Sequence, residues 1–142
     1  MTILIDTNVA LDILLNHKPW YVNAALIFGM AQQNFFKGYV SASTVTDLFY
    51  ITAKENGKKT AREAIKRLLK VFYPATVTDK NIYQALEMEW DDFEDSVQFT
   101  VGNDLSVDYI VTRNIKDFSS SSIDVVTPEQ FIKTITDLNE LN

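Results

Sequence analysis

The 142-residue sequence contains no cysteine and only one histidine, His17. The absence of cysteine excludes disulfide bonds, thiolate nucleophiles and cysteine metal ligands. A lone histidine nearly excludes histidine-based catalytic triads and histidine-rich zinc sites, and we expect His17 itself in a loop. Any chemistry must therefore depend on carboxylates, hydroxyls, amides or lysines.

Long hydrophobic runs are also missing. No apolar stretch approaches the roughly 20 residues of a membrane span, and no charged segment followed by an apolar one marks a leader. We therefore expect a cytosolic protein without membrane association. Hydrophobic residues make up 46% and charged residues 23% of the chain, as in folded globular proteins. We expect one domain covering residues 1–142.

Positive charge is scarce, since the formal net charge is −6. This argues against a general nucleic-acid coat protein, because phosphate binding depends on Lys and Arg. It does not exclude a nucleic-acid enzyme whose carboxylates are covered by divalent cations. The one concentrated basic surface lies on a predicted helix over residues 60–72 and comprises Lys59, Arg62, Lys66, Arg67 and Lys70. A solvated helix face is the simpler interpretation, and a phosphate-contacting surface is the alternative.

An unbroken apolar run at residues 2–5 leads directly into Asp6, Thr7 and Asn8, and helix-periodic residues follow. The pattern predicts a strand, a turn and a helix. Side chains at the carboxyl end of a strand in an open parallel sheet line the ligand-binding crevice. Asp6 is therefore a candidate catalytic residue, and the simpler alternative is that Asp6, Thr7 or Asn8 caps the helix.

Strands and helices are predicted to alternate along the rest of the chain. We expect strands near 39–42, 75–77, 108–112 and 123–126, and helices over 20–36, 43–56, 60–72 and 79–88, from about 92 onward and after 127. Gly38 is expected to end the second helix, and capping boxes at Thr60–Glu63 and Thr127–Gln130 to open the fourth and last helices. The alternation predicts a three-layer α/β/α domain with a mostly parallel sheet.

Acids or amides follow a strand or open a helix in four separate segments: Asp6; Asp47, expected in the first turn of its helix; Asp92 or Asp95; and Asn114 or Asp117. Helix-dipole complementation explains one or two of them. Convergence of all four is what a carboxylate site for Mg²⁺ or Mn²⁺ requires. Such an ion activates water and stabilises in-line displacement at phosphorus, so a phosphodiester is the natural substrate.

Three stretches resemble the PIN domain, particularly the VapC-like toxins of bacterial toxin–antitoxin pairs. They are Ile3-Leu4-Ile5-Asp6-Thr7-Asn8, the segment from Asp92 to Ser96, and the segment from Asp108 to Phe118, which contains Thr-Arg-Asn-Ile-Lys-Asp-Phe. The resemblance covers nearly the whole chain. It implies a Mg²⁺- or Mn²⁺-dependent endoribonuclease, commonly a homodimer, that a cognate antitoxin holds inactive by inserting a segment into the active-site groove.

The resemblance also implies roles for individual residues. Asp6, Asp47, Asp95 and Asp117 are the expected catalytic acids, and Asp6, Asp95, Asp117 and Asn114 the expected metal ligands. Thr7, Asn8 and Thr112 would orient ligands or water, and Asp92 is a further secondary site residue. If the acidic edge is a nuclease site, the basic residues Lys59, Arg62 and Lys66, together with Arg113, are candidate contacts to RNA phosphates.

Two other classes of function stay open. A binding module that has the fold but little or no catalysis is supported by Asp47, one methylene shorter than the family's usual glutamate, and by the neutral Asn114. A phosphatase of the haloacid-dehalogenase type would need an aspartate two residues after Asp6, where Asn8 stands.

Overall fold

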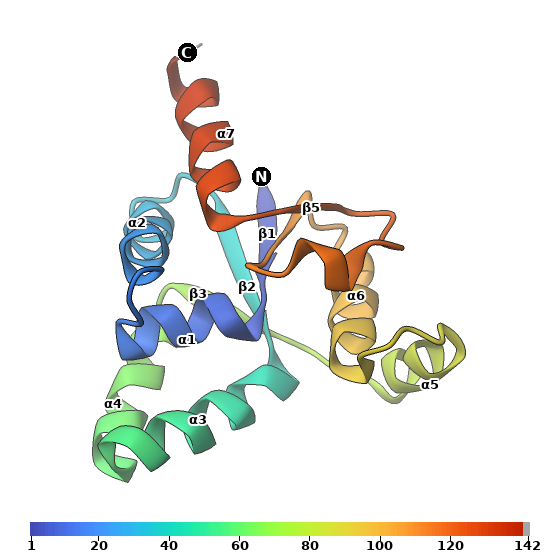
Figure 1. Cartoon of the computed structure of the whole chain (residues 1–142), viewed down its shortest axis with the longest axis horizontal. Coiled ribbons are helices and arrows are strands. Elements are labelled where there is room, and N and C mark those ends of the chain that lie inside the picture. The colour runs from blue at the N-terminus through green and yellow to red at the C-terminus, as the bar shows by residue number, and fades with distance from the viewer. Residues whose placement is uncertain (141–142) are drawn as a thin grey trace.

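Five parallel strands form the centre of the structure, in the order β3-β2-β1-β4-β5 (Figure 1). The computed structural model describes residues 1–140. All neighbouring strands are parallel, which confirms the predicted sheet. The strands are β1 (Thr2–Ile5), β2 (Lys37–Ser41), β3 (Phe72–Ala75), β4 (Tyr109–Val111) and β5 (Asp124–Val126).

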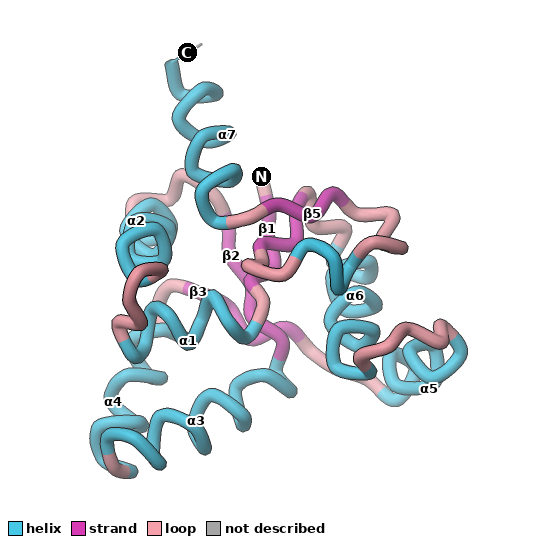
Figure 2. Tube along the Cα trace, in the orientation of Figure 1, coloured by secondary structure: helices cyan, strands magenta, loops and turns pink. Residues whose placement is uncertain are grey.

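Helices cover both faces of this sheet (Figure 2). Side chains alternate across a strand, so Ile3 and Ile5 pack into one core cluster while Leu4 packs into another on the opposite face. The first face carries α1 (Thr7–Leu15), α2 (Tyr21–Gln32), α3 (Ala42–Asn56), α4 (Lys58–Leu69) and α7 (Pro128–Glu140). The second carries α5 (Asp79–Glu87), α6 (Phe93–Leu105) and the 3₁₀ helix η1 (Ile115–Phe118). The three-layer α/β/α prediction is therefore confirmed.

The central strand β1 is buried on both faces and has the register that builds the site. Ile5 is level with Val40 of β2 and with Val111 of β4. The next residue of each strand therefore lies at the same carboxyl edge of the sheet. In β1 and β4 these residues are Asp6 and Thr112, both buried.

The sequence predicts that Gly38 ends the second helix, and the structure shows that this prediction is wrong. Helix α2 stops at Gln32, and Gly38 lies inside β2, paired with Phe72 of β3. A Cβ at position 38 would stand 2.4 Å from two ring carbons of Phe72, which is fully buried. The glycine is therefore needed for close packing of the sheet under an aromatic ring.

Several predicted boundaries were shifted. Strand β3 is Phe72–Ala75 and contains Pro74, whereas we placed a strand after that proline. Pro is tolerated here because β3 is an edge strand. Helix α4 starts at Lys58 after Gly57, so Thr60 does not open it. The last capping box is confirmed, because Thr127 and Gln130 exchange side-chain and backbone hydrogen bonds of 3.0 and 3.2 Å.

Helix α3 also begins earlier than expected, at Ala42. Asp47 therefore lies in its second turn, and the prediction of a first-turn position was wrong. Within residues 1–140, no helix has the length and apolar character needed to span a membrane.

Candidate active site

Asp6 is the N-cap of α1 and is 6% exposed. Its Oδ1 accepts hydrogen bonds from the Thr7 amide at 2.7 Å and from Gln98 Nε2 at 2.8 Å. Its Oδ2 accepts from Thr112 Oγ1 at 2.7 Å and from Asn8 Nδ2 at 3.1 Å. The capping alternative is confirmed, and the same carboxylate also accepts hydrogen bonds from Gln98 of α6 and from Thr112 after β4. Four donors occupy the four acceptor positions of a carboxylate.

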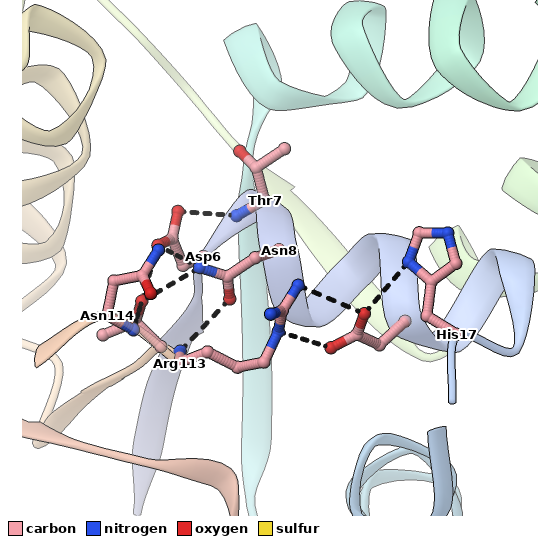
Figure 3. Close-up of polar contacts among 8 residues, drawn as sticks. Asp6, Thr7, Asn8, His17, Arg113 and Asn114 are labelled. Carbon is pink, nitrogen blue, oxygen red and sulfur yellow. Dashed lines mark hydrogen bonds and ion pairs between the residues drawn. The ribbon is translucent and has the colours of Figure 1, made fainter. Parts of the chain in front are cut away.

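Asn8 joins the start of α1 to the end of β4 (Figure 3). While its amide nitrogen donates to Asp6, its Oδ1 accepts from the Arg113 backbone amide at 3.2 Å. Thr112 Oγ1 in turn accepts from the Asn114 amide at 3.0 Å. These bonds fix the corner between β4 and η1. Asn8 is therefore fully engaged as a neutral bridge, at the position where a phosphatase would need an acid.

Helix α6 brings two inward-facing polar side chains to the same place. Asp92 is its N-cap and accepts from the Asp95 amide at 3.0 Å. Asp95 and Gln98 are both buried and stand three residues apart, so they share one face of the helix. Gln98 was not among the predicted site residues. The available signal was a lone amide on a helix face whose neighbours Val97 and Val101 are core residues.

The electrostatics of the site centre on Asp95. Burial, followed by the negative charges of Asp6, Asp92, Asp117 and Glu94, raises the pKa of Asp95 from 3.8 to about 7. Like charges held together in this way disfavour the ionised carboxylate. The charges of Asp6 at the start of α1, of Asp92 at the start of α6 and of Asp117 in η1 thus all act on Asp95.

Glu94 is an acid of the site and, after Gln98, the second site residue that the sequence analysis did not predict. Its Oε1 accepts from Thr7 Oγ1 at 2.7 Å, and Thr7 Oγ1 also lies 3.2 Å from Thr44 Oγ1 of α3. Desolvation and the charges of Asp47 and Asp6 raise the pKa of Glu94, against the opposing effect of the Thr7 bond. In the sequence, Glu94 lies within the segment from Asp92 to Ser96 that resembles the PIN domain, but no role was assigned to it.

Asp47, Asp117 and Asn114 lie at the rim of the site. All three are exposed. Asp47 acts on Glu94 through its charge and Asp117 acts on Asp95. Asn114 precedes η1 and contributes its backbone amide to Thr112.

Arg113 points away from these acids and is held by α1. Its Nε lies 2.9 Å from Oδ2 of Asp12, which is 1% exposed, and its guanidinium stacks 3.8 Å from the centre of the Trp20 ring. His17 Nδ1 lies 3.2 Å from the other Asp12 oxygen (Figure 3). Burial raises the pKa of Asp12, and the charges of Arg113 and His17 oppose this. The ion pair therefore ties α1 to the segment after β4.

The other predicted RNA-contacting residues lie on α4. Lys59, Arg62 and Lys66 are exposed, and the Arg62 guanidinium lies 5.3 Å from the centre of the Phe49 ring of α3. The basic surface thus belongs to the α3–α4 pair, on the sheet face opposite α6.

The donor set suits a hard divalent cation by its chemistry. Oxygen ligands and uncompensated negative charge, seen in the raised pKa of Asp95, are the features that Mg²⁺ and Mn²⁺ sites offer. Within residues 1–140, however, no three acidic or histidine side chains converge on one point as a ready-made site. Water ligands, which Mg²⁺ usually keeps, would have to complete the coordination.

Comparisons with known proteins agree with this geometry. A PIN domain family model matches residues 2–116. Among solved structures, the chain is similar to VapBC2 from Rickettsia felis bound to a promoter DNA fragment, with 17% identity, a TM-score of 0.67, and coverage of 89% of this chain and 98% of the other. The chain is also similar to a toxin–antitoxin complex from Klebsiella pneumoniae, with 20% identity, a TM-score of 0.65, and coverage of 88% of this chain and 96% of the other. A third similar structure is Mycobacterium tuberculosis VapC20, described as a sarcin-ricin loop cleaving toxin. Its identity is 17% and its TM-score 0.62, and the match covers 76% of this chain and 86% of the other.

Comparison with curated protein sequences gives no match. The family model covers most of the chain, including Asp6, Asp95 and Thr112. The similar structures share the strand and helix arrangement that brings these residues together. The chain is a member of the PIN domain family.

Proposed function

We propose that this protein is a Mg²⁺- or Mn²⁺-dependent endoribonuclease of the VapC type, neutralised by a cognate antitoxin and active as a homodimer. Family membership supports a nuclease, and the toxin–antitoxin complexes among similar folds support the antitoxin. The similarity to VapC20, a sarcin-ricin loop cleaving toxin, supports RNA as the substrate.

One observation carries the proposal. Burial, together with the charges of four neighbouring carboxylates, raises the pKa of Asp95 to about 7. A folded protein that keeps such repelling groups together without a compensating cation loses stability, so their retention indicates a function. With one histidine and no cysteine, the chain offers few other nucleophiles or bases.

Each side chain then has a defined task. Asp95 and Asp6 would hold the cation, with Glu94, Asp117 and Asn114 at the outer positions and Asp47 beyond Glu94. A bound Mg²⁺ or Mn²⁺ lowers the pKa of water and stabilises charge at the phosphoryl group. Thr112 and Asn8 keep Asp6 oriented, and Thr7 orients Glu94. Burial of Asp6 and Asp95 limits competing water.

The test compares Asp95→Asn with wild type in two assays. We expect Mn²⁺ to raise the Tm of wild type by several degrees at a hundredfold excess over Kd, where binding adds about 2.7 kcal/mol. We expect no such shift in the variant, and a loss of at least about 100-fold in RNA cleavage, as when catalytic groups are removed from other enzymes.

Asp137→Asn is the matched control, because it makes the same change on an exposed residue of α7. It should keep both the Mn²⁺ shift and cleavage. Persistent cleavage by metal-replete Asp95→Asn, after removal of host ribonucleases, would contradict the proposal.

A second function has a specific observation in its favour. All four acceptor positions of Asp6 are already filled, and three acids do not converge within the described chain. Both features suit a catalytically weak or silent module that keeps the fold for partner binding. Absence of any Mn²⁺ shift in wild type at millimolar metal would favour this module over the nuclease.

A further inference from the structure

Gln98 is buried to 0% exposure and crosses the site to reach Asp6. Its Nε2 is the one side-chain donor to Asp6 Oδ1 among the described residues, and the other donor to that oxygen is the Thr7 backbone amide. The bond joins α6 to the end of β1 across 92 positions of sequence. It is therefore a tertiary link within the acidic cluster.

The other half of the same amide is left without a partner. Gln98 Oε1 is buried and makes no hydrogen bond within residues 1–140. An unsatisfied buried carbonyl is costly, and such groups call for an explanation. The reverse amide orientation would place Oε1 against Asp6 Oδ1, acceptor against acceptor. The orientation is thus set by Asp6, at the expense of the carbonyl.

Gln98 also stands one helical turn after Asp95 on the same face of α6. Asp6 and Asp95 repel each other, since Asp6 raises the pKa of Asp95. A donor fixed to the helix of one acid and bonded to the other holds the two against that repulsion. Hydrogen bonds that orient ligand side chains affect metal affinity by about 10- to 100-fold in other proteins.

We propose that Gln98 is a positioning residue that fixes the Asp6 carboxylate and its spacing from Asp95. This inference deepens the proposed nuclease function and rests on it only for its metal-binding consequence. The orienting role itself is a property of the metal-free protein.

The variant is Gln98→Met, which keeps length and removes both amide groups. In metal-free protein, hydrogen exchange of the Thr7 amide should accelerate at least tenfold, because that amide bonds only to Asp6 Oδ1 in the described structure. The apparent Kd for Mn²⁺, from titrated thermal shifts, should rise 10- to 100-fold.

Thr100→Val is the matched control on the same helix. Its buried hydroxyl donates to the carbonyl of Val97 at 2.8 Å, so the variant removes a buried hydrogen bond without removing a donor to Asp6. It should leave Thr7 exchange and the Mn²⁺ response at wild-type values. If both variants accelerated Thr7 exchange equally, the effect would be general loosening of α6, and the positioning role would be overturned.

Gln98→Leu serves as a second variant in case the methionine prevents folding. It also removes both amide groups and adds no group that could donate to Asp6 or bind the metal, so the same two losses are expected. Unchanged Thr7 exchange in either folded variant would overturn the inference, whatever the metal does. A wild type that shows no Mn²⁺ response would instead count against the nuclease, while Thr7 exchange still decides the role of Gln98.

Discussion

Asp95 makes the stability of the metal-free protein depend on pH. Its pKa is about 7 in the folded state and 3.8 in the absence of the surrounding groups. Between these values the folded state binds a proton that the unfolded state has lost, so stability falls as pH rises from about 4 to about 7. Above about pH 7 the full destabilisation persists.

Asp95→Asn removes this titration. In the presence of a chelator, the variant should melt several degrees above wild type at pH 8, and the difference should shrink toward zero near about pH 4. Thermal unfolding across this range measures it. A Tm difference that does not change with pH would show that the Asp95 carboxylate is not strained by its neighbours.

Prediction from sequence succeeded at this scale where chain position alone places a residue. Asp6 follows the first strand as predicted, and the register of β1 with β4 places it beside Thr112, which was predicted as the last residue of a strand and follows β4 in the structure. Gln98 and Glu94 were missed because their roles depend on which face of α6 meets the sheet. That face is set by packing of Val97 and Val101 against α5 and the sheet. Four of the five residues 91–95 are acids, so the sequence does not distinguish the acids that face the sheet from those that face the solvent.

Gly38 in β2 and Gly29 in α2 differ in the space available for a larger side chain. At Gly38 in β2 an added methyl group would collide with the Phe72 ring at 2.4 Å, whereas at Gly29 within α2 nothing lies within 4 Å. Gly38→Ala should therefore destabilise the protein by about 1–3 kcal/mol through overpacking. Gly29→Ala should stabilise it by up to about 1 kcal/mol, because Gly is unfavourable inside a helix.

Denaturant unfolding of the two alanine variants beside wild type measures both effects. Their opposite signs separate local crowding from a general response to alanine. Equal stability of Gly38→Ala and wild type would show that Phe72 moves freely, contrary to its full burial.

Element boundaries were predicted well where local chemistry decides them. Thr127, Pro128 and Gln130 open α7 as expected, because a reciprocal cap and an N1 proline act within one turn. Local sequence signals gave wrong predictions where packing within the sheet determines the structure. Pro74 looks like a strand breaker, yet it is accommodated at the edge of the sheet, and Gly38 looks like a helix stop, yet it is pinned beneath Phe72.

The acids of the candidate site and the basic residues of α4 lie in different parts of the described structure. The acids gather at the carboxyl edge of the sheet around Asp95, while the exposed lysines of α4 lie with the helices on the α3 side. An RNA that reaches the acidic site would gain affinity from phosphate contacts to that basic surface. Lys59 and Lys66, two turns apart, suit such contacts.

The double variant Lys59→Ala/Lys66→Ala should weaken RNA binding severalfold and lower the salt dependence by about two phosphate contacts. Its Mn²⁺ shift should stay at the wild-type value. Arg62 is left intact because its guanidinium packs over Phe49. The control, Lys80→Ala/Lys133→Ala, changes two exposed lysines on α5 and α7. If RNA binding by the two double variants depended equally on salt concentration, the lysines of α4 would not contact the RNA.

The hydrogen bond from Thr112 to Asp6 spans 106 positions of sequence. During synthesis the Asp6 carboxylate is therefore made well before its partners Gln98 and Thr112. A chain that has been made only as far as α5 holds Asp6 without Gln98, Asp95 or Thr112, and its β1 still lacks β4. If the protein cleaves RNA, the bonds that orient Asp6 are complete only after β4 has been made.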